Sequence, residues 1–405
     1  MSVPTQVPRR PRLLVLNQYY GPAESTGELL RELCEDLTPS LKVTVIAARP
    51  ADQETRAMPL RGVDVRWTPA TSFGKGSIAL RLVNYLSFLA AAVPIALRAP
   101  RPDVVLCMTN PPFGGLLGAA LARLRRARLV VTFQDVHPDV GQISGRLTSR
   151  PVVWALARVR DFFLRRADRV VAISEPMRRR LIERGGAPER VSVIGNWIDA
   201  EEISPQSRDN PWASEHGLVG RFTLMHAGNV GLLQDLETFV EAAALVPDAL
   251  YVIVGEGANI RPLVERAGNK RLANVRFLPR QPRASLGLLL ASADAHLVSL
   301  MPGLAGLMEP SKLFGVLAAA RPVLAAMEPG SQAAEVVELS GCGLLSEPGD
   351  PSSLAAAVRR LAALPEAERE EMGRRGRAYC EQHFTRACAA GAYRDLLLSL
   401  TPART

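Results

Sequence analysis

Three polar residues, Glu309, Ser311 and Lys312, stand directly before an apolar run with helical spacing. Ser311 or a neighbour can cap the helix that this run predicts from Leu313 onward. The free backbone N–H groups and the positive dipole end of a helix start favour an anion, and the ammonium group of Lys312 adds a full charge. The pattern therefore indicates a site for a phosphate-type anion. The alternative is an ordinary capped helix with Lys312 as a solvated surface charge.

Two glycines lie in the turn HAGNVG, residues 226–231, which follows an apolar run and precedes a helical pattern. Gly228 and Gly231 let the backbone approach a diphosphate group closely. The spacing does not match G-x-G-x-x-G, so the turn does not indicate a nicotinamide site. Glu256 lies between two glycines after the next apolar run, in a tight turn of a common kind.

Asp135 and His137 follow a buried strand pattern in the stretch VVTFQDVHPD. In doubly wound folds the carboxyl ends of the strands are where ligands bind. Isolated carboxylates at such positions are also often structural, so a structural role and a functional role both remain open for this pair.

The chain has no Asp-x-Asp sequence and no cluster of His and Cys residues. Its five cysteines, at positions 34, 107, 342, 380 and 388, show neither paired nor metal-type spacing, which favours a reducing compartment and argues against a zinc site. We therefore expect a cytoplasmic protein without a metal. A leaving diphosphate would have to be neutralised by helix ends and Lys312.

The elements that position these residues repeat along a chain of 405 residues, which is long enough for two domains. Apolar runs alternate with helical patterns, which predicts parallel sheets with helices on both faces. The expected strands lie at 13–17, 43–47, 63–67, 104–108, 129–133, 170–173 and 191–194, and then at 222–227, 250–254, 275–278, 295–299, 322–326 and 342–345.

The predicted fold is α/β, with two doubly wound, Rossmann-like domains that face each other across a cleft. We expect a first domain at residues 1–200, a linker at 201–220 and a second domain at 221–385. A last helix, within residues 386–405, could return to the first domain. In the first domain Ser25 and Glu28 have the form of a capping box, and Gly27 allows close approach of the backbone to a ligand.

The net charge of +9 is concentrated in the first half of the chain. Residues 1–200 carry 29 Lys and Arg against 17 Asp and Glu, whereas residues 201–405 carry 20 against 23. The basic half has no recognisable nucleic-acid module, so an anionic membrane surface is the expected partner and nucleic acid is not. Residues 1–12 are basic without an apolar core behind them, so we do not expect a signal peptide.

Two segments of the basic half could meet a membrane. Residues 78–97 are mostly apolar but are interrupted by Arg81, Asn84 and Pro94, which favours a buried or membrane-surface helix over a spanning one. Residues 151–166 mix Trp154 and two phenylalanines with arginines at 158, 160, 165 and 166. The alternative for this second segment is an amphipathic helix packed on its own sheet.

The order of the motifs resembles that of the family 4 glycosyltransferases of GT-B fold, in particular the WcaI-like branch that builds colanic acid, other exopolysaccharides and O-antigen. The resemblance covers nearly the whole chain. The stretches that carry it are NQYYGPAESTG, VVTFQDVHPD, ADRVVAISEPMRRRLIERG with VIGNWID, HAGNVGLLQDLETFVEAA, VIVGEG, NVRFLPRQPRASLGLLLASADAHLVSL and MEPSKLFGVLAAARPVLA.

The resemblance implies a retaining, metal-independent transfer of a sugar from a nucleotide diphosphate donor, without a cofactor. The acceptor would be a glycan on a polyprenyl diphosphate, and the enzyme would lie peripherally on the cytoplasmic face of the membrane. Asp135 or His137 would act on the acceptor hydroxyl, and Lys312 on the leaving diphosphate. The expected donor-binding residues are Gly228, Asn229, Gly231, Gln234, Glu256, Arg280, Glu309, Ser311, Lys312 and Leu313, and the expected phosphate loop of the first domain contains Gly21, Ser25, Thr26 and Gly27.

The chain departs from the family pattern at several positions. Leu307 and Gly315 occupy the places of two glutamates that usually surround the donor, and Glu309 is a possible substitute for the first. Asn229 and Gln234 replace a usual Arg and Lys, and Gln134 replaces a common histidine. We interpret these changes as the character of a subfamily. Two rival functions remain open: a nucleotide-sugar 2-epimerase of the same fold, and a catalytically silent partner subunit.

Overall fold

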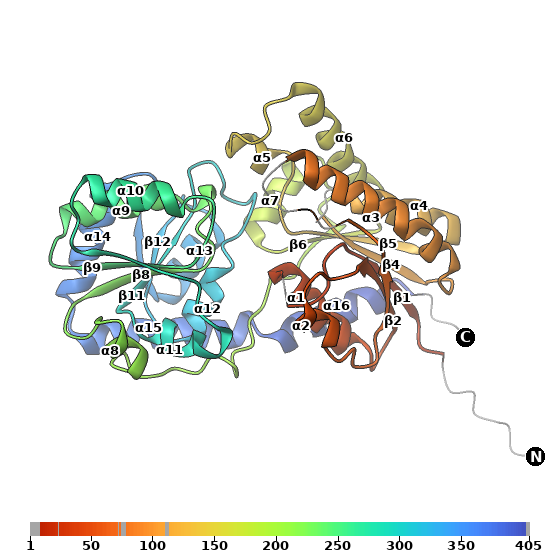
Figure 1. Ribbon diagram of the computed structural model, residues 1–405. Helices are drawn as coiled ribbons and strands as arrows, with labels where there is room; N and C mark the ends of the chain where they lie inside the picture. Colours follow the sequence, from red (N-terminus) through yellow and green to blue (C-terminus); the bar gives the residue numbers. More distant parts are fainter. Residues whose placement is uncertain (1–8, 23, 72, 74–77, 110–112, 402–405) are drawn as a thin grey trace, which may run out of the picture.

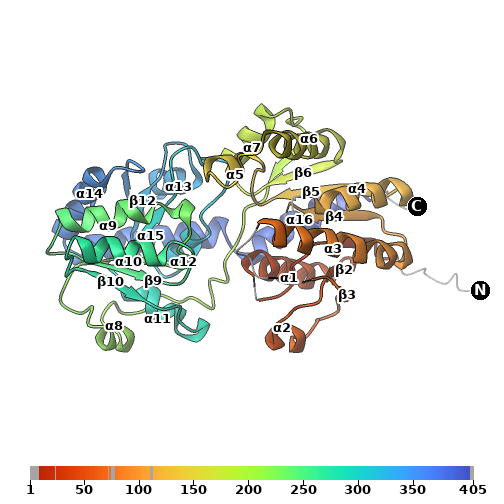
Figure 2. The same ribbon diagram turned by 45° about the horizontal axis from the view of Figure 1, so that its top comes forward.

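The computed structural model describes residues 9–22, 24–71, 73, 78–109 and 113–401. The expectation about a signal peptide concerns residues 1–12, most of which lie outside the described residues. Figures 1 and 2 show two α/β domains side by side, the first in red to yellow and the second in green to blue.

The first domain is built on a parallel sheet of seven strands in the order β3-β2-β1-β4-β5-β6-β7. The seven expected strands are confirmed, with shifts of at most one residue at their ends. Their bounds are β1 (Arg12–Leu16), β2 (Lys42–Ala48), β3 (Asp64–Thr68), β4 (Val104–Met108), β5 (Arg128–Phe133), β6 (Arg169–Ala172) and β7 (Val191–Val193).

The second domain has a parallel sheet of six strands in the order β10-β9-β8-β11-β12-β13. Here too the expected strands are confirmed. They are β8 (Thr223–Ala227), β9 (Leu250–Val254), β10 (Val275–Leu278), β11 (Ala295–Ser299), β12 (Val323–Ala326) and β13 (Gly343–Ser346). The two-domain α/β architecture that the resemblance implied is therefore observed.

Helices cover both faces of each sheet (Figure 1). The first domain contains α1 (Ser25–Leu37), α2 (Gln53–Ala57), α3 (Ile78–Arg98), α4 (Gly114–Arg125), α5 (Asp139–Ile143), α6 (Arg150–Arg166) and α7 (Glu175–Glu183). The second contains α8 (Pro211–Glu215), α9 (Leu236–Leu245), α10 (Ile260–Asn269), α11 (Leu286–Ala291), α12 (Lys312–Ala318), α13 (Gln332–Ser340), α14 (Pro351–Ala363) and α15 (Glu366–His383), with the short 3₁₀ helices η1 (Leu232–Gln234) and η2 (Arg283–Ser285), and α16 (Arg386–Ser399) ends the described chain.

The central strands are buried on both faces, which explains why they read as continuous apolar runs. In β1, Leu14 and Leu16 pack into the same core as Phe88 of α3. Leu13 and Val15 point to the opposite face, where they join the core beneath α1 and α16. The alternation follows from the two-residue period of a strand.

The last helix, α16, packs on the first domain against α1 (Figure 1). Arg386 forms an ion pair with Asp36 of α1 at 2.6 Å, and the hydroxyl groups of Tyr393 and Thr132 are 3.1 Å apart. The chain therefore crosses between the domains twice, once before α8 and once between α15 and α16.

Helix α8 lies inside the segment expected to be an irregular linker. Asn210 caps this helix by accepting a hydrogen bond from the N–H of Ala213, and Trp212 is buried. The helix packs against α11 of the second domain. An Asn at the N-cap position followed by Pro at the first helical position, here Pro211, is typical of a helix start. The sequence therefore contained a signal for α8 that the expected linker did not take into account.

The capping box expected at Ser25 and Glu28 is wrong. Helix α1 begins at Ser25 with Glu24 at the N-cap position, so Ser25 lies inside the first turn. Glu28 instead pairs with Arg31 and with Arg283 of the second domain.

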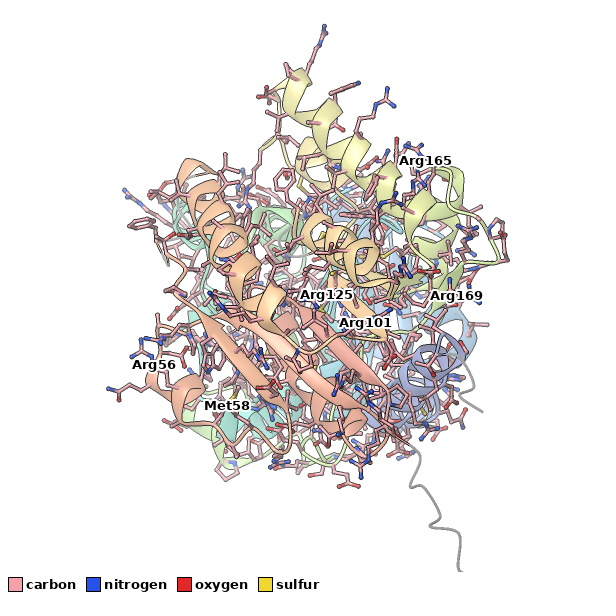
Figure 3. The ribbon with its side chains drawn as sticks, turned by 90° about the vertical axis from the view of Figure 1, so that its right-hand side faces the viewer. Arg56, Met58, Arg101, Arg125, Arg165 and Arg169 are labelled. Atoms are coloured by element: carbon pink, nitrogen blue, oxygen red, sulfur yellow. The ribbon has the colours of Figure 1, made fainter. Side chains whose placement is uncertain are left out.

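The interrupted apolar segment at residues 78–97 forms α3, which runs over the sheet beside α4. Phe88, Ala92 and Ala96 of α3 are buried in the core. Figure 3 looks onto the side of the first domain that carries α3, α4 and α6. Every described helix falls short of the length or the apolar character that crossing a bilayer requires.

Candidate active site

A cavity of about 130 Å³ lies in the second domain where β8 and β11 end and α12 begins. These are neighbouring strands of a parallel sheet, so their carboxyl ends meet at one edge. The cavity brings together five of the expected donor-binding residues, and its lining consists of Asn229, Gln234, Val298, Ser299, Leu300, Met308, Glu309, Pro310, Ser311 and Lys312.

Lys312 is half-buried and is not a solvated surface charge. Its side chain lies over Gly228, where an added Cβ atom would come within 2.8 Å of Lys312 Cε. Gly228 also has a φ of +130°, which side chains rarely adopt, so glycine is required there. Burial disfavours the charged ammonium group and lowers the pKa of Lys312 to about 8.

Lys312 stands out in the composition as well. The chain has four lysines, at positions 42, 75, 270 and 312, among 49 basic residues. A guanidinium stays charged in proteins, whereas a lysine shifts its pKa readily when it is buried. A lysine at position 312, in a chain whose basic residues are nearly all arginines, therefore indicates a functional position, and counting the residue types in the sequence could have shown this.

Ser311 occupies the N-cap position of α12, but its side chain makes no capping hydrogen bond. The expectation that Ser311 caps this helix through its side chain is wrong, because its helical backbone (φ −57°, ψ −19°) differs from the extended backbone of a capping residue. The Ser311 side chain lines the cavity instead. Leu313 points into the apolar core and does not line it.

Asn229 and Gln234 stand where the family usually has basic residues. Gly231 makes room for both, since a Cβ atom there would meet Gln234 Oε1 at 2.6 Å and Asn229 Nδ2 at 2.9 Å. The Oε1 atom of Gln234 is buried and has no hydrogen-bond partner among the described residues. Two side-chain amides thus offer donors and acceptors to a ligand without adding charge.

Glu309 connects this cavity to the first domain. Its Oε1 atom accepts a hydrogen bond from the hydroxyl of Ser174, which precedes α7. Its Oε2 atom is buried and has no hydrogen-bond partner of standard geometry among the described residues. Burial raises the pKa of Glu309 to about 8, although the Ser174 hydroxyl and the nearby Gln332 backbone N–H favour the ionised form.

Asp135 reaches the same region from the first domain. Asp135 and Met308 form an antiparallel bridge, and the N–H of Val136 donates to the carbonyl of Leu307 at 2.8 Å. Residues directly opposite in such a bridge have side chains on the same face, with Cβ atoms roughly 4.5–5.5 Å apart. Asp135 therefore lies beside Met308, which lines the cavity.

Burial raises the pKa of Asp135, while the nearby His137 lowers it in part. Both side chains are half-buried. The preceding residue, Gln134, is engaged elsewhere: it exchanges two side-chain hydrogen bonds with Asn196, of 3.2 and 3.0 Å. Of these three residues, Asp135 is the one placed by a backbone bridge to the loop after β11.

The two positions of the missing glutamates have structural roles. Leu307 is buried against the first domain through the bridge. An added Cβ atom at Gly315 would contact Leu290 at 3.4 Å, so this position faces α11. Glu309 is the acidic residue of this loop that lines the cavity.

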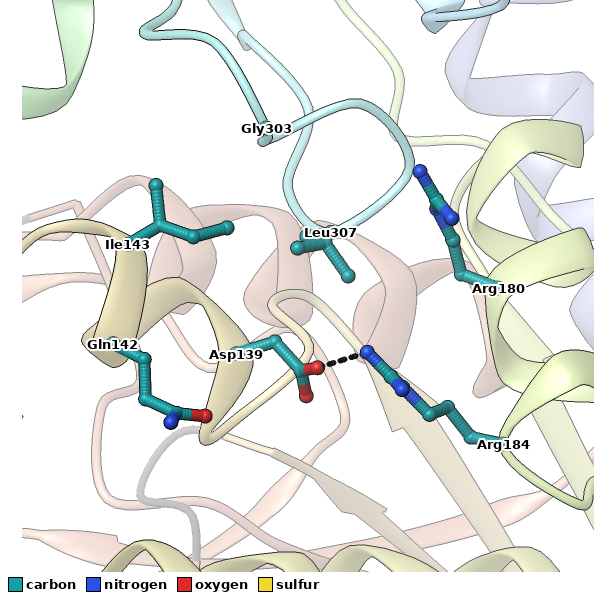
Figure 4. Close-up of a pocket in the computed structure, with 7 residues that line it drawn as sticks. All are labelled: Asp139, Gln142, Ile143, Arg180, Arg184, Gly303 and Leu307. Carbon is teal, nitrogen blue, oxygen red and sulfur yellow. Dashed lines mark hydrogen bonds and ion pairs between the residues drawn. The ribbon is translucent and has the colours of Figure 1, made fainter.

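A second cavity of about 300 Å³ lies between the domains on the other side of Leu307 (Figure 4). Its lining residues are Asp139, Gln142 and Ile143 from α5, Arg180 and Arg184 on and after α7, and Gly303 and Leu307 from the loop after β11. Asp139 pairs with both Arg184 and Arg160, and Arg180 pairs with Glu183. Because these arginines are matched by carboxylates, the cavity has no excess positive charge that would mark it as a diphosphate site.

Besides Leu313, two of the expected donor-binding side chains lie apart from the cavity. Glu256 is exposed, although its carbonyl accepts a hydrogen bond from Val230 N–H at 2.9 Å. Arg280 is also exposed and follows β10, the edge strand of the sheet. Gly228 and Gly231 contribute backbone space and not lining side chains.

The expected phosphate loop of the first domain folds tightly on itself. Gly21 N–H donates to the carbonyl of Gly27 at 3.0 Å, and both glycines are buried. Ser25 is exposed and Thr26 is half-buried. The residue after this loop, Glu28, forms an ion pair with Arg283 of the second domain, so the loop ends at the boundary between the domains.

Sequence reasoning missed Ser174 and the role of Leu307. Ser174 was visible only as a helix-start residue before Glu175 and Pro176. Its contact to a residue 135 positions away could not be read from local pattern. Within the described residues, no group of three or more His, Cys, Asp or Glu side chains is arranged to hold a metal ion.

Comparisons with known proteins show which family the chain is similar to. The family described as "Glycosyl transferase 4-like domain" matches residues 21–197, and the family described as "Glycosyl transferases group 1" matches residues 212–379. The chain is 32% identical to the glycosyltransferase WbjE of Pseudomonas aeruginosa over 280 residues, which are 67% of this chain and 69% of that protein.

A second relative is WcaI of Escherichia coli (strain K12), a glycosyl transferase named for colanic acid biosynthesis. It is 28% identical over 296 residues, which are 70% of this chain and 73% of that protein. Among solved structures, Anabaena HepE in complex with UDP and glucose superposes with a TM-score of 0.74 at 19% identity, covering 96% of this chain and 99% of that chain. This last likeness concerns the fold.

Proposed function

We propose that this chain, which belongs to the glycosyltransferases with a 4-like first domain and a group 1 second domain, transfers a sugar from a nucleotide diphosphate to a glycan acceptor in bacterial surface-polysaccharide assembly. The observation that carries the proposal is the cavity beside Lys312, which we call the donor cavity. It offers a half-buried ammonium group, two side-chain amides and a serine hydroxyl at the carboxyl edge of a parallel sheet. WcaI is named for polysaccharide biosynthesis and HepE binds UDP and glucose, which supports the same substrate class.

In this proposal Lys312 stabilises the negative charge that develops on the leaving diphosphate. Two unit charges about 4 Å apart interact by about 4 kcal/mol at an effective dielectric constant of ~20, which is far more than in bulk water. Such an interaction accelerates the reaction to the extent that it is stronger in the transition state. With Lys312 in this place we infer a transfer without a metal ion and, following the family resemblance, with retention of configuration.

Asp135 acts on the acceptor hydroxyl in this proposal, by orienting it or by accepting its proton. The bridge to Met308 supports this role, because it holds Asp135 beside the donor cavity. His137 lies close enough to influence the pKa of Asp135 and is the second candidate for the same role. The proposed acceptor is a sugar carried on a polyprenyl diphosphate.

An acceptor of that kind requires a membrane surface, and α3 supports one. Leu82, Val83, Leu86, Val93 and Leu97 are 39–54% exposed. They recur on the side of α3 opposite the buried Phe88, and we call them the α3 stripe. An exposed apolar stripe of this kind suits the interface of a bilayer.

Helix α6 adds aromatic and basic groups on the same side of the first domain (Figure 3). Trp154 is 63% exposed, with the Arg158 guanidinium 5.3 Å from its ring centroid. Arg165 and Arg166 are also exposed. Arg160, which the sequence grouped with them, differs: it is held by Asp139 and Asp161, with a side chain 11% exposed, so it is not available to lipid.

Each basic residue near an anionic membrane surface contributes about 1 kcal/mol of attraction. We therefore infer that the enzyme binds peripherally to the cytoplasmic face of the membrane through α3 and α6. A nucleotide-sugar donor would then reach the second domain from the aqueous side.

The experiment that tests the proposed function is a thermal-shift screen with nucleoside diphosphates and their sugars, followed by a transfer assay. A ligand that binds only the folded state raises the melting temperature. We expect one nucleoside diphosphate to do so, and its sugar to be consumed when membrane extract supplies a lipid-linked acceptor. Epimerisation of the donor without acceptor would point to the epimerase instead, and binding without any turnover to a silent subunit.

A further inference from the structure

One hydrogen bond joins the donor cavity to the opposite domain. Ser174 is buried at the start of α7, where its Oγ atom accepts a hydrogen bond from the N–H of Met177 at 3.0 Å. The hydroxyl proton is thereby free to point outward from the helix, and it is donated to Oε1 of Glu309. Ser174 thus caps its own helix and holds a residue of the second domain with the same oxygen atom.

Glu309 has hydrogen-bonding capacity left over. Its Oε2 atom is buried without a standard hydrogen-bond partner among the described residues. Among the described residues, the charged group that acts on the Glu309 carboxyl is the like-charged Glu335, and the nearby Gln332 backbone N–H is its other polar neighbour besides Ser174. A buried polar atom without a partner is costly, so a ligand group that hydrogen-bonds Oε2 would be bound favourably.

The first domain also contacts the stretch of the loop that directly precedes Glu309. Arg180 Nε donates to the carbonyl of Ala305 at 3.2 Å, and Val136 N–H donates to Leu307 O at 2.8 Å. A Cβ atom on Gly306 would come within 2.7 Å of the Pro176 carbonyl, so the loop and the start of α7 are in close contact. The Ser174–Glu309 hydrogen bond therefore belongs to an extended interdomain contact.

We propose that Ser174 is a positioning residue of the donor site. Its hydroxyl holds the Glu309 carboxyl from across the domain boundary, so that Oε2 meets a hydroxyl group of the donor, either on the ribose or on the transferred sugar. The inference rests on the proposed function, because it assumes a nucleotide-sugar donor in this cavity. It adds a consequence: the donor site is complete only when α7 lies against the loop after β11, so a change at Ser174 in the first domain alters donor binding in the second.

Three variants separate positioning from helix capping. Ser174→Gly removes the hydroxyl but costs a helix cap only a few tenths of a kcal/mol. Ser174→Thr keeps a hydroxyl at the same place. Thr385→Gly is the matched control, because Thr385 caps α16 through the N–H of Cys388 and is not among the residues that line the donor cavity.

The readout is isothermal titration with UDP, GDP, CDP, ADP and dTDP, and with the nucleoside diphosphate glucose of the base that binds best. We expect Ser174→Gly to weaken binding of the affected ligand by about 3- to 10-fold, as loss of one hydrogen bond would. Ser174→Thr should restore it, and Thr385→Gly should match the wild type. Equal affinities for the wild type and Ser174→Gly overturn the inference, whereas a wild type that binds none of the nucleotides overturns the proposed function itself.

Glu309 variants identify which hydroxyl is bound. If Oε2 meets the ribose, Glu309→Ala weakens binding of the nucleoside diphosphate but not of its 2′,3′-dideoxy form. If it meets the transferred sugar, Glu309→Ala weakens binding of the sugar nucleotide alone. Glu309→Gln keeps an acceptor for Ser174 and a donor for the ligand, so it should retain affinity within about threefold. An alanine variant that binds every ligand as the wild type does contradicts the proposal.

Discussion

Asp135 and Met308 lie opposite each other in an antiparallel bridge that joins the two domains. Because residues opposite in such a bridge share a face, the carboxyl group of Asp135 is held beside a residue that lines the donor cavity. Four residues later the same loop reaches Lys312. Candidate groups for acceptor and donor chemistry, 177 positions apart in the chain, are thereby brought to one place.

The first prediction concerns this carboxyl group. Asp135→Asn keeps the shape of the side chain and removes its charge, so turnover should fall by about 10²-fold or more, the range of general-base contributions, with donor affinity changed little. Steady-state kinetics with titration of the donor check this. Near-normal turnover would make Asp135 a structural residue of the bridge.

Much of the fold could be predicted from the sequence because parallel strands buried on both faces leave continuous apolar runs. All thirteen expected strands are present, since runs such as Val104–Met108 are legible without tertiary information. The starts of the helices were harder to predict from the sequence. Ser25 and Ser311 looked like caps, yet neither side chain makes a capping bond. Ser25 already lies inside the first turn of α1, and Ser311 stands at the N-cap of α12 with a helical instead of an extended backbone.

The candidate site could be predicted in part. Lys312 and its neighbours form a local pattern, and the structure places them around one cavity. Arg280 and Glu256 were carried over from motif order, and the structure leaves both side chains exposed. The Ser174–Glu309 contact was out of reach, because it depends on how the two domains meet.

The second prediction concerns stability. Burial lowers the pKa of Lys312 to about 8 from 10.5. Below pH 8 the folded protein carries a half-buried charge, which lowers its free energy of unfolding. Between pH 8 and pH 10.5 the unfolded chain binds more protons than the folded one, so the contribution of Lys312 to the free energy of unfolding rises with pH. Lys312→Met should therefore raise the free energy of unfolding at pH 7 by about 1–3 kcal/mol.

Urea unfolding of both proteins at pH 7 and pH 10 measures this, and the gain should shrink at the higher pH. A Met variant that is less stable than the wild type at pH 7 would show that the ammonium group is stabilised in the folded protein.

The third prediction is the pH dependence of donor binding. As pH rises through about 8, Lys312 loses its positive charge and Glu309, whose pKa burial raises to about 8, gains a negative one. Both changes disfavour an anionic ligand, so the affinity for a nucleoside diphosphate should fall about tenfold between pH 7.5 and 9.5. Titration calorimetry across this range checks it, and Lys312→Met should reduce the pH dependence to the part that Glu309 contributes. A constant wild-type affinity would contradict the assignment.

The fourth prediction is that the first domain binds anionic membranes. The protein should sediment with liposomes that contain anionic lipid and dissociate as salt is raised, because charges are screened beyond roughly 10 Å at 0.1 M salt. Replacing Arg158, Arg165 and Arg166 by Gln should release it without loss of donor binding. Leu86→Ser, at the most exposed position of the α3 stripe, should weaken the remaining salt-resistant binding.

The matched control carries the same number of changes on the second domain, at the exposed Arg261, Arg360 and Arg374. This variant should bind liposomes as the wild type does. If this control variant is released from liposomes as much as the first-domain variant, net charge alone would explain the binding. If the wild type does not sediment with anionic liposomes at low salt, a soluble acceptor becomes the better proposal.

The central claim is that the cavity beside Lys312 holds the donor diphosphate without a metal ion. The most direct measurement is titration calorimetry of wild type and Lys312→Ala with the best nucleoside diphosphate, in chelator and again with added magnesium or manganese. Loss of a charge-assisted contact of about 1.5–3 kcal/mol should weaken binding by about 10- to 150-fold in the variant, while chelator leaves wild-type binding unchanged. Equal affinities in wild type and variant, or wild-type binding that appears only with a divalent metal, would contradict the account.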